Sequence, residues 1–305
     1  MLNRLRTINN FQVLTTDVDI QLNGAVIGKC NQSTLSELSK CLHRIPIPEQ
    51  SDSVAFEDIF GGNLKDINQR LQKCGTISSN KIIIHCTRLG WRNELYPIFD
   101  SDGHVQMTLE RSCSSLLGIR VFGCHLNAYT DDGRMWIARR NLTKQTYPGM
   151  LDNMAAGGIG ADCFMNPVLE RKFEIKENMI RECAEEAGMP RHIAENARYH
   201  GAVSFHHSSD CRGIVAETNY VFDLQVPSDY QPTAVDGEVD SFSLLSIQEV
   251  NKKIVSGEFA PGAATTIIDF MIRHGYITPQ NEPDYDIIVQ ELHPSSVSDL
   301  PGPRI

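Results

Sequence analysis

The first chemical signal in the chain is a trio of glutamates within Arg181-Glu182-Cys183-Ala184-Glu185-Glu186-Ala187-Gly188-Met189. Glu182, Glu185 and Glu186 stand at positions i, i+3 and i+4, spacings that bring side chains onto one face of a helix. Carboxylates this close raise one another's pKa values unless a cation lies among them. Because Mg²⁺ prefers carboxylate oxygens, the trio is a predicted metal site, with Mg²⁺ or Mn²⁺ as the cofactor. A solvated, charged helix face is the alternative for this segment.

The sequence predicts a helix that holds these glutamates and ends at Gly188. A narrow apolar stripe that can pack on a sheet is formed by residues at every fourth position: Ile175, Met179, Cys183 and Ala187. Glycine is common just after the last turn of a helix, and Pro190 prevents continuation. The preceding residues 151–158 are rich in glycine, which lets a backbone approach a ligand or a neighbouring helix closely.

Three cations, Arg139, Arg140 and Lys144, follow a predicted hairpin whose strands cover residues 121–129 and 135–140. They lie at a strand end directly before the loop Pro148-Gly149. Cations in this position can bind phosphate oxygens, arginine in bidentate fashion. Solubilising charges at a sheet edge are the alternative.

Two further segments combine chemically useful side chains. In Trp91-Arg92-Asn93-Glu94 an aromatic ring stands beside a cation and a carboxylate; packing at a domain seam is the alternative for the tryptophan. Glu238, within Asp236-Gly237-Glu238-Val239-Asp240, precedes a predicted strand. It is a candidate second metal ligand or general base, with an ordinary turn acid as the alternative.

The composition limits the class of protein. The chain has 305 residues, 41% of them hydrophobic, and a net charge of −10, which argues against a broad nucleic-acid footprint. No apolar run reaches the roughly 18 residues of a membrane span. Nine cysteines form no CxxC pair, so free thiols in a reducing compartment are expected rather than a disulfide framework or zinc site. Arg4 and Arg6 faintly resemble a transit peptide, but no secretory segment follows, and a cytoplasmic location is expected.

The pattern of elements predicts two modules and a tail. Residues 1–117 are expected to form an α+β extension, in which the apolar run Lys81-Ile82-Ile83-Ile84 is predicted to be a strand. Residues 118–277 form the second module, which contains the glutamates. The tail, residues 278–305, carries five prolines and is expected to be weakly ordered.

The glutamate segment, together with Gly157-Gly158, resembles the Nudix box, Gly-x5-Glu-x7-Arg-Glu-U-x-Glu-Glu-x-Gly-U, in which U is apolar. The last nine positions match in full. The first half departs from the pattern, because the leading glutamate falls at Phe173 when counted back from Arg181 and at Phe164 when counted forward from Gly158. The difference of nine residues indicates an insertion in this loop, in which Glu170 or Glu174 is the acid that could compensate.

The rest of the chain, from about residue 10 to residue 277, is similar to the Nudix subfamily with an N-terminal extension of the DUF4743 type. This subfamily includes fungal and plant enzymes acting on damaged thiamine diphosphates and a module fused to some thiamine pyrophosphokinases. The motifs that carry the resemblance are Trp91-Arg92-Asn93-Glu94, Phe122-Gly123-Cys124-His125-Leu126-Asn127, Met135-Trp136-Ile137-Ala138-Arg139-Arg140, Leu151-Asp152-Asn153, Asp236-Gly237-Glu238-Val239 and Ile268-Asp269-Phe270-Met271-Ile272-Arg273-His274-Gly275.

The resemblance implies a Nudix α/β/α sandwich with a mixed sheet, which hydrolyses the diphosphate bond of an oxidised or damaged thiamine diphosphate to release a monophosphate. It implies that the three glutamates hold the metal, and that Glu185, Glu186 or Glu238 takes the proton from the attacking water. In this assignment Arg139, Arg140 and Lys144 bind the distal phosphate, and Trp91 or Trp136 contacts the organic moiety. There are two alternatives: a binding or sensor protein that has lost turnover, and a hydrolase of nucleoside diphosphate derivatives. The oligomeric state is left open, with a homodimer as one possibility.

Overall fold

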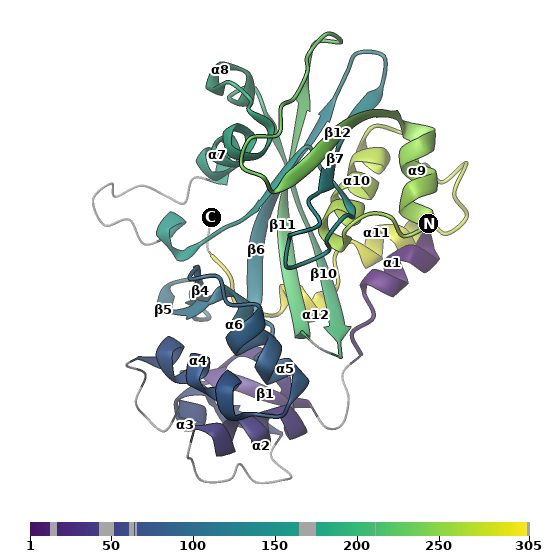
Figure 1. Cartoon of the computed structure of the whole chain (residues 1–305). Coiled ribbons are helices and arrows are strands. Elements are labelled where there is room, and N and C mark those ends of the chain that lie inside the picture. Colours follow the sequence, from purple (N-terminus) through teal and green to yellow (C-terminus); the bar gives the residue numbers. More distant parts are fainter. Residues whose placement is uncertain are drawn as a thin grey trace.

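The computed structural model has one large sheet covered by helices on both faces, with a smaller α+β module beside one end of it (Figure 1). The structure describes residues 1–12, 17–42, 52–60, 64, 66–164, 175–210 and 212–303. The expected architecture, a mixed sheet with helices on both faces preceded by a smaller α+β region, is confirmed.

The large sheet has the strand order β10-β11-β6-β7-β12. Its strands are β6 (Arg120–Tyr129), β7 (Arg134–Arg140), β10 (Arg198–Ser209), β11 (Gly213–Gln225) and β12 (Val239–Ser246). β11 pairs with β6 in parallel and the other neighbours are antiparallel, so the sheet is mixed.

β6 and β7 pair only between Tyr129 and Met135 before they diverge. Two short strands continue the pairing on either side of the gap: β8 (Leu151–Asp152) joins β7, and β9 (Ala155–Gly158) joins β6. The glycine-rich segment is therefore a strand next to the centre of the sheet.

Alternation along the strands builds two cores. On β11, Tyr220 and Phe222 enter the core beneath α7 (Ile175–Ala187) and α8 (Arg191–Ala194), whereas Val221 enters the core on the opposite face. That second core is covered by α1 (Leu2–Ile8), α9 (Ile247–Val255), α10 (Pro261–Arg273) and α11 (Tyr285–Glu291).

The N-terminal module has its own hydrophobic core. Its elements are β1 (Asp17–Leu22), β2 (Ala25–Asn31), α2 (Gln32–Cys41), β3 (Ser53–Ala55), α3 (Phe56–Phe60), α4 (Ile67–Ile77), α5 (Lys81–Ile84), a π-helical turn (His85–Leu89), β4 (Leu95–Phe99), β5 (Val105–Glu110) and α6 (Arg111–Ser114). The predicted strand at Lys81–Ile84 is wrong, because Asn80 caps a helix there by accepting hydrogen bonds from the N–H groups of Ile82 and Ile83.

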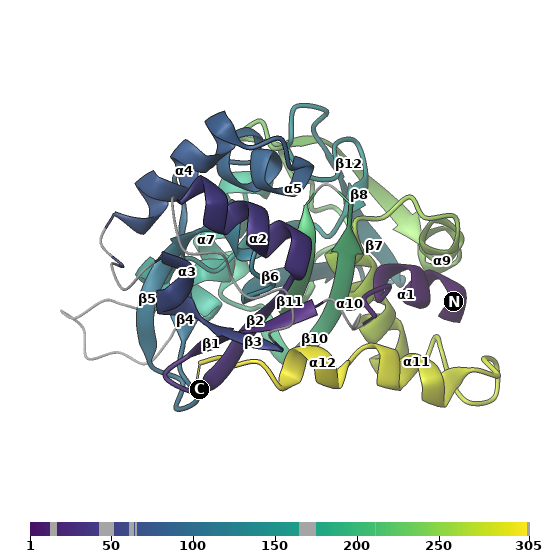
Figure 2. The same ribbon diagram turned by 90° about the horizontal axis from the view of Figure 1, so that it is seen from below.

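The two ends of the chain pack together on the second core. α1 contacts α11 and β10, and Figure 2 shows α11 and the short helix α12 (Ser295–Ser298) running along the edge of the sheet. The expectation of a weakly ordered tail is wrong for residues 278–303, because Ile288, Leu292 and Val297 are buried. The prolines in this segment lie outside the helices and do not prevent helix formation. Among the described residues, no helix has the length and apolarity needed to cross a membrane.

Candidate active site

Helix α7 presents the three predicted glutamates to the region around β9. Its apolar stripe is buried as predicted, and Gly188 follows the helix with a left-handed φ of +59°. Glu186 is buried, Glu182 is half-buried and Glu185 is exposed. The trio therefore runs from the protein interior to solvent along one side of the helix.

Glu186 is fixed to the central sheet. Its Oε2 accepts a hydrogen bond of 2.8 Å from the backbone N–H of Ala156 in β9. Burial raises the pKa of the Glu186 carboxyl, the Ala156 hydrogen bond opposes that shift, and the charges of Asp152 and Glu182 add to it. A cation beside Glu186 would offset this cost of holding a buried carboxylate.

Glu182 lies directly over Gly157. A Cβ atom at residue 157 would stand only 2.0 Å from Cδ of Glu182, so the glycine is what allows the carboxylate to sit against the strand. Arg181 Nη2 lies 3.3 Å from Glu182 Oε1. Burial raises the pKa of Glu182, and the charge of Arg181 opposes that shift.

A second group of acids faces α7 from the loop before β12. Carboxylate oxygens of Glu186, Asp236 and Glu238 lie within 4.8 Å of one another, which makes these residues a potential metal-binding group. Glu238 was predicted here from the sequence. Asp236 was not chosen, although it stands two residues earlier in the same motif. A turn can bring two side chains with this separation to the same side of the backbone.

Glu182, Glu185 and Glu238 line one cleft together with several cations. The cleft cations are Arg92, Arg111, Arg140, Lys144 and Arg181. Lys144 forms an ion pair with Glu238, and burial lowers the pKa of its ammonium group. The structure thus brings carboxylates and cations together in one opening, and a metal-bound phosphate needs both.

Two of these cations come from the N-terminal module and were missed in the sequence. Arg92 lies shortly before β4, and its Nη2 donates a hydrogen bond to Oγ1 of Thr146 over 3.4 Å. Arg111 begins α6, pairs with Glu94 at 2.8 Å and lies over the ring of Tyr96. Arg92 could have been suspected from its place beside Trp91, but no local signal marks Arg111.

The predicted phosphate-binding residues separate into two groups. Arg140 lines the cleft, but its guanidinium is already bound to Asp152 at 2.7 Å and to the carbonyl of Thr146. Arg139 does not join the cleft: consecutive strand residues point to opposite faces, and its Nη1 donates to the carbonyl of Gly149 instead.

Neither predicted aromatic residue lines the cleft. Trp91 packs against the core of the N-terminal module, and its indole N–H donates to Oδ1 of Asn93 over 2.9 Å. Trp136 is 5% exposed and lies in the core beneath α7. Trp91 therefore fulfils the packing alternative, and Trp136 is also a packing residue, because both rings lie against hydrophobic cores.

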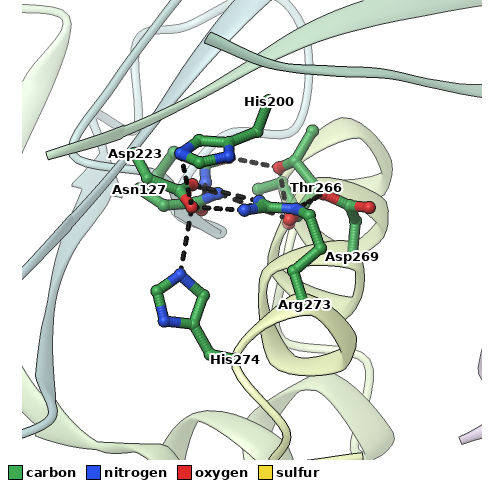
Figure 3. Close-up of polar contacts among 9 residues, drawn as sticks. Asn127, His200, Asp223, Thr266, Asp269, Arg273 and His274 are labelled. Atoms are coloured by element: carbon green, nitrogen blue, oxygen red, sulfur yellow. Dashed lines mark hydrogen bonds and ion pairs between the residues drawn. The ribbon is translucent and has the colours of Figure 1, made fainter. Parts of the chain in front are cut away.

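A buried polar network supports the sheet behind the cleft. His125 Nδ1 lies 2.8 Å from Oδ1 of Asn153, whose Nδ2 donates to Oδ1 of Asn127 over 2.7 Å. Asn127 in turn donates to Asp223 over 3.1 Å. Figure 3 shows Asp223 at the centre of the outer part of the network, in contact with Arg273, His274 and His200.

The donor set of the cleft fits a hard divalent cation. Its anionic groups are carboxylates, which such a cation prefers, and glycine at position 157 leaves room for one of them against the backbone. Glu182, Glu185 and Glu186, with Asp236 and Glu238 opposite, are the residues that could hold Mg²⁺ or Mn²⁺. Phe173, Glu170 and Glu174, which bear on the altered half of the predicted box, lie outside the described residues.

Residues 123–265 match the family model of the NUDIX domain. The matched range contains α7, the glycine-rich strand β9 and the acids before β12. This part of the chain is therefore a NUDIX domain.

Curated relatives extend the match beyond the domain. An uncharacterized protein of Saccharomyces cerevisiae is 38% identical over 67% of this chain and 61% of its own length. Nudix hydrolase 20, chloroplastic, of Arabidopsis thaliana is 38% identical over 65% of this chain and 51% of its own length. The MutT protein from Methanosarcina mazei Go1, a solved structure, is 18% identical with a TM-score of 0.37, covering 51% of this chain and 95% of that one. The chain thus spans about half to three-fifths of the length of these two curated relatives.

Proposed function

We propose that this protein hydrolyses the diphosphate bond of a thiamine diphosphate derivative in an Mg²⁺- or Mn²⁺-dependent reaction that releases a monophosphate. One observation carries the proposal: the carboxylates of α7 and of the loop before β12 share a cleft with Arg92, Arg111 and Lys144. A diphosphate needs both kinds of partner, because its negative charge must be neutralised before a water can attack.

The burial and contacts of each residue suggest its role in this reaction. When bound, the metal ion neutralises phosphate charge and orients the diphosphate. Glu182 and Glu186, held by Gly157 and Ala156, would be fixed ligands. Glu185 is exposed in the cleft, so it is free to accept a proton from water, and Glu238 is the second candidate base. Arg92, Arg111 and Lys144 would bind the terminal phosphate.

The thiamine assignment is supported by the subfamily motifs in both modules, and it extends to the architecture. We take residues 1–117 as an extension that contributes Arg92 and Arg111 to the site, residues 118–277 as the hydrolase domain and residues 278–305 as a C-terminal segment. The proposal also includes a small-molecule substrate and no nucleic-acid or membrane partner. It places the protein in the cytoplasm, with a homodimer as a possible assembly.

A panel of diphosphates tests this function. Purified protein with Mg²⁺ or Mn²⁺ is offered thiamine diphosphate, its oxidised analogues, ADP-ribose and nucleoside diphosphates, with Glu185→Gln as the control. Monophosphate release that favours the thiamine compounds supports the proposal. Preference for ADP-ribose or nucleoside diphosphates would move the substrate to the nucleotide alternative, and binding without release from any compound would favour the sensor alternative.

A further inference from the structure

A second hollow opens from the same cleft toward the other face of the sheet. It measures about 190 Å³ and lies between β6, β11, the N-terminus of α10 and the N-terminal module. Arg92, Arg111, Arg140 and Gly157 line both the hollow and the carboxylate cleft. A molecule whose phosphates occupy the cleft can therefore place its remaining part in the hollow.

One buried polar side chain of this hollow lacks hydrogen-bond partners. Asn219, in the middle of β11, is 0% exposed, and neither Oδ1 nor Nδ2 has a hydrogen-bond partner within the part of the chain that the structure describes. The amides of Asn127 and Asn153 in the adjoining network are both bonded. Leaving a buried amide unpaired is costly, so the Asn219 amide needs a partner from outside the protein, either a ligand or a buried water.

The backbone of two glycines lies close against the Asn219 amide. A Cβ atom at Gly123 would lie 2.5 Å from its Oδ1, and one at Gly262 would lie 3.0 Å from its Nδ2. Glycine thus stands beside each atom of the amide, once on β6 and once on α10.

The lining of the hollow suits a flat ring. Aromatic side chains in it include Phe122, His125, Tyr147 and Phe205. Its volume of about 190 Å³ exceeds the roughly 150 Å³ cavity that takes up benzene in another protein. A carboxamide presents a donor beside an acceptor, and such a pair binds an amino group next to a ring nitrogen in bidentate fashion.

We propose that this hollow is the subsite for the organic moiety of the diphosphate substrate, and that the Asn219 amide binds the edge of a nitrogen heterocycle carrying a donor beside an acceptor. The inference rests on the proposed function, because the diphosphate is what connects the hollow to the cleft. The Asn219 amide would then select the substrate through its ring, while the cleft recognises the phosphates that all diphosphates share.

Calorimetric binding without turnover tests the subsite. Thiamine diphosphate and inorganic pyrophosphate are titrated in EDTA into the wild type, Asn219→Leu, Gly262→Ala and Asn251→Leu. Gly262→Ala blocks the Nδ2 side of the amide without removing it. Asn251 on α9 is a matched control, because its buried Oδ1 also has no partner among the described residues but it does not line the hollow.

The expected result is at least a tenfold loss of thiamine diphosphate affinity in Asn219→Leu and in Gly262→Ala, with pyrophosphate affinity unchanged and Asn251→Leu like the wild type. Asn219→Leu should keep the melting temperature of the wild type, because it breaks no internal hydrogen bond. Unchanged thiamine diphosphate affinity in both variants, equal losses for pyrophosphate, or no binding by the wild type would overturn the inference. A lowered melting temperature with unchanged affinity would assign the amide to a buried water instead.

The subsite and the proposed function fail in different measurements. If binding depends on Asn219 but no monophosphate is released with Mg²⁺, the hydrolase function is wrong and the subsite stands. If monophosphate is released while binding is independent of Asn219, the subsite is wrong and the function stands.

Discussion

The carboxylate of Glu186 accepts a 2.8 Å hydrogen bond from the backbone N–H of Ala156, and this bond ties helix α7 to strand β9. Because α7 is held at this point, Glu182 one turn earlier is brought over Gly157 and Glu185 faces the cleft. This side chain-to-backbone contact and the glycine help to set the positions of Glu182 and Glu186, and two of the following predictions use them.

Gly157→Ala should displace Glu182 without unfolding the protein. The new methyl group would meet Cδ of Glu182 at 2.0 Å, and the end of a glutamate side chain can move away at small cost. We expect the melting temperature to change little and the affinity for Mn²⁺, measured by electron paramagnetic resonance, to fall about tenfold or more, as for other changes in ligand orientation.

Glu182→Ala provides the comparison for that variant. If the methyl group acts only by moving Glu182, the double variant should bind Mn²⁺ no more weakly than Glu182→Ala alone. Additive losses in the double variant would show that Gly157 acts in some other way.

Glu186→Gln should reduce the stabilisation that the protein gains from metal. A ligand that binds only the folded state raises its stability, by about 2.7 kcal/mol at a hundredfold excess over Kd. Saturating Mg²⁺ should therefore raise the melting temperature of the wild type and of the exposed control Glu195→Gln, just after α8, but raise that of Glu186→Gln much less. Equal shifts in all three proteins would remove Glu186 from the metal site.

Arg92→Met should weaken substrate binding, whereas Arg139→Met should not. Arg92 lines the cleft, but Arg139 points away from it and bonds to Gly149. Loss of a charge-assisted hydrogen bond costs about 1.5–3 kcal/mol, so KM for thiamine diphosphate should rise about tenfold or more in Arg92→Met. A larger effect of Arg139→Met in steady-state kinetics would reverse this assignment.

His206 should make the protein less stable as the pH falls. It is buried in β10, stacks on Phe11 at 3.8 Å, and burial lowers its pKa from 6.5 to about 4. Between these two values the unfolded chain binds the proton and the folded chain does not, so the free energy of unfolding falls with decreasing pH in this window. Urea titrations at pH 7.5 and pH 5 should show a loss of roughly 1–2 kcal/mol attributable to His206.

His206→Phe removes the titrating ring while it keeps an aromatic partner for Phe11. Its loss of stability between the two pH values should be smaller than that of the wild type by this amount. An identical loss in wild type and variant would mean that His206 is already protonated in the folded protein or that other groups set the pH dependence.

Local patterns allowed much of the NUDIX domain to be predicted. Helix α7 was recognised because its stripe repeats at helical spacing and because Gly188 can adopt a positive φ. The run Lys81–Ile84 was assigned wrongly, since a short apolar segment fits a buried strand and a helix equally, and only the cap from Asn80 distinguishes them.

Contacts between distant segments could not be predicted in this way. Arg92 and Arg111 reach the cleft because the N-terminal module packs beside the sheet, and Asp223 meets Arg273 across 50 positions of sequence. Asn219 had no local signal at all: its surroundings are set by Gly123 and Gly262, which lie on a neighbouring strand and helix. Such residues become visible only when the strands are paired.

Phosphorus NMR of thiamine diphosphate incubated with the protein and Mg²⁺ tests the central claim most directly. The account predicts that the diphosphate signals are replaced by equal amounts of a phosphate monoester and inorganic phosphate. It also predicts that Glu185→Gln lowers this rate by about 10²-fold or more, as expected for loss of a general base or a metal ligand. Intact diphosphate with the wild type, or equal rates with Glu185→Gln, would contradict the account.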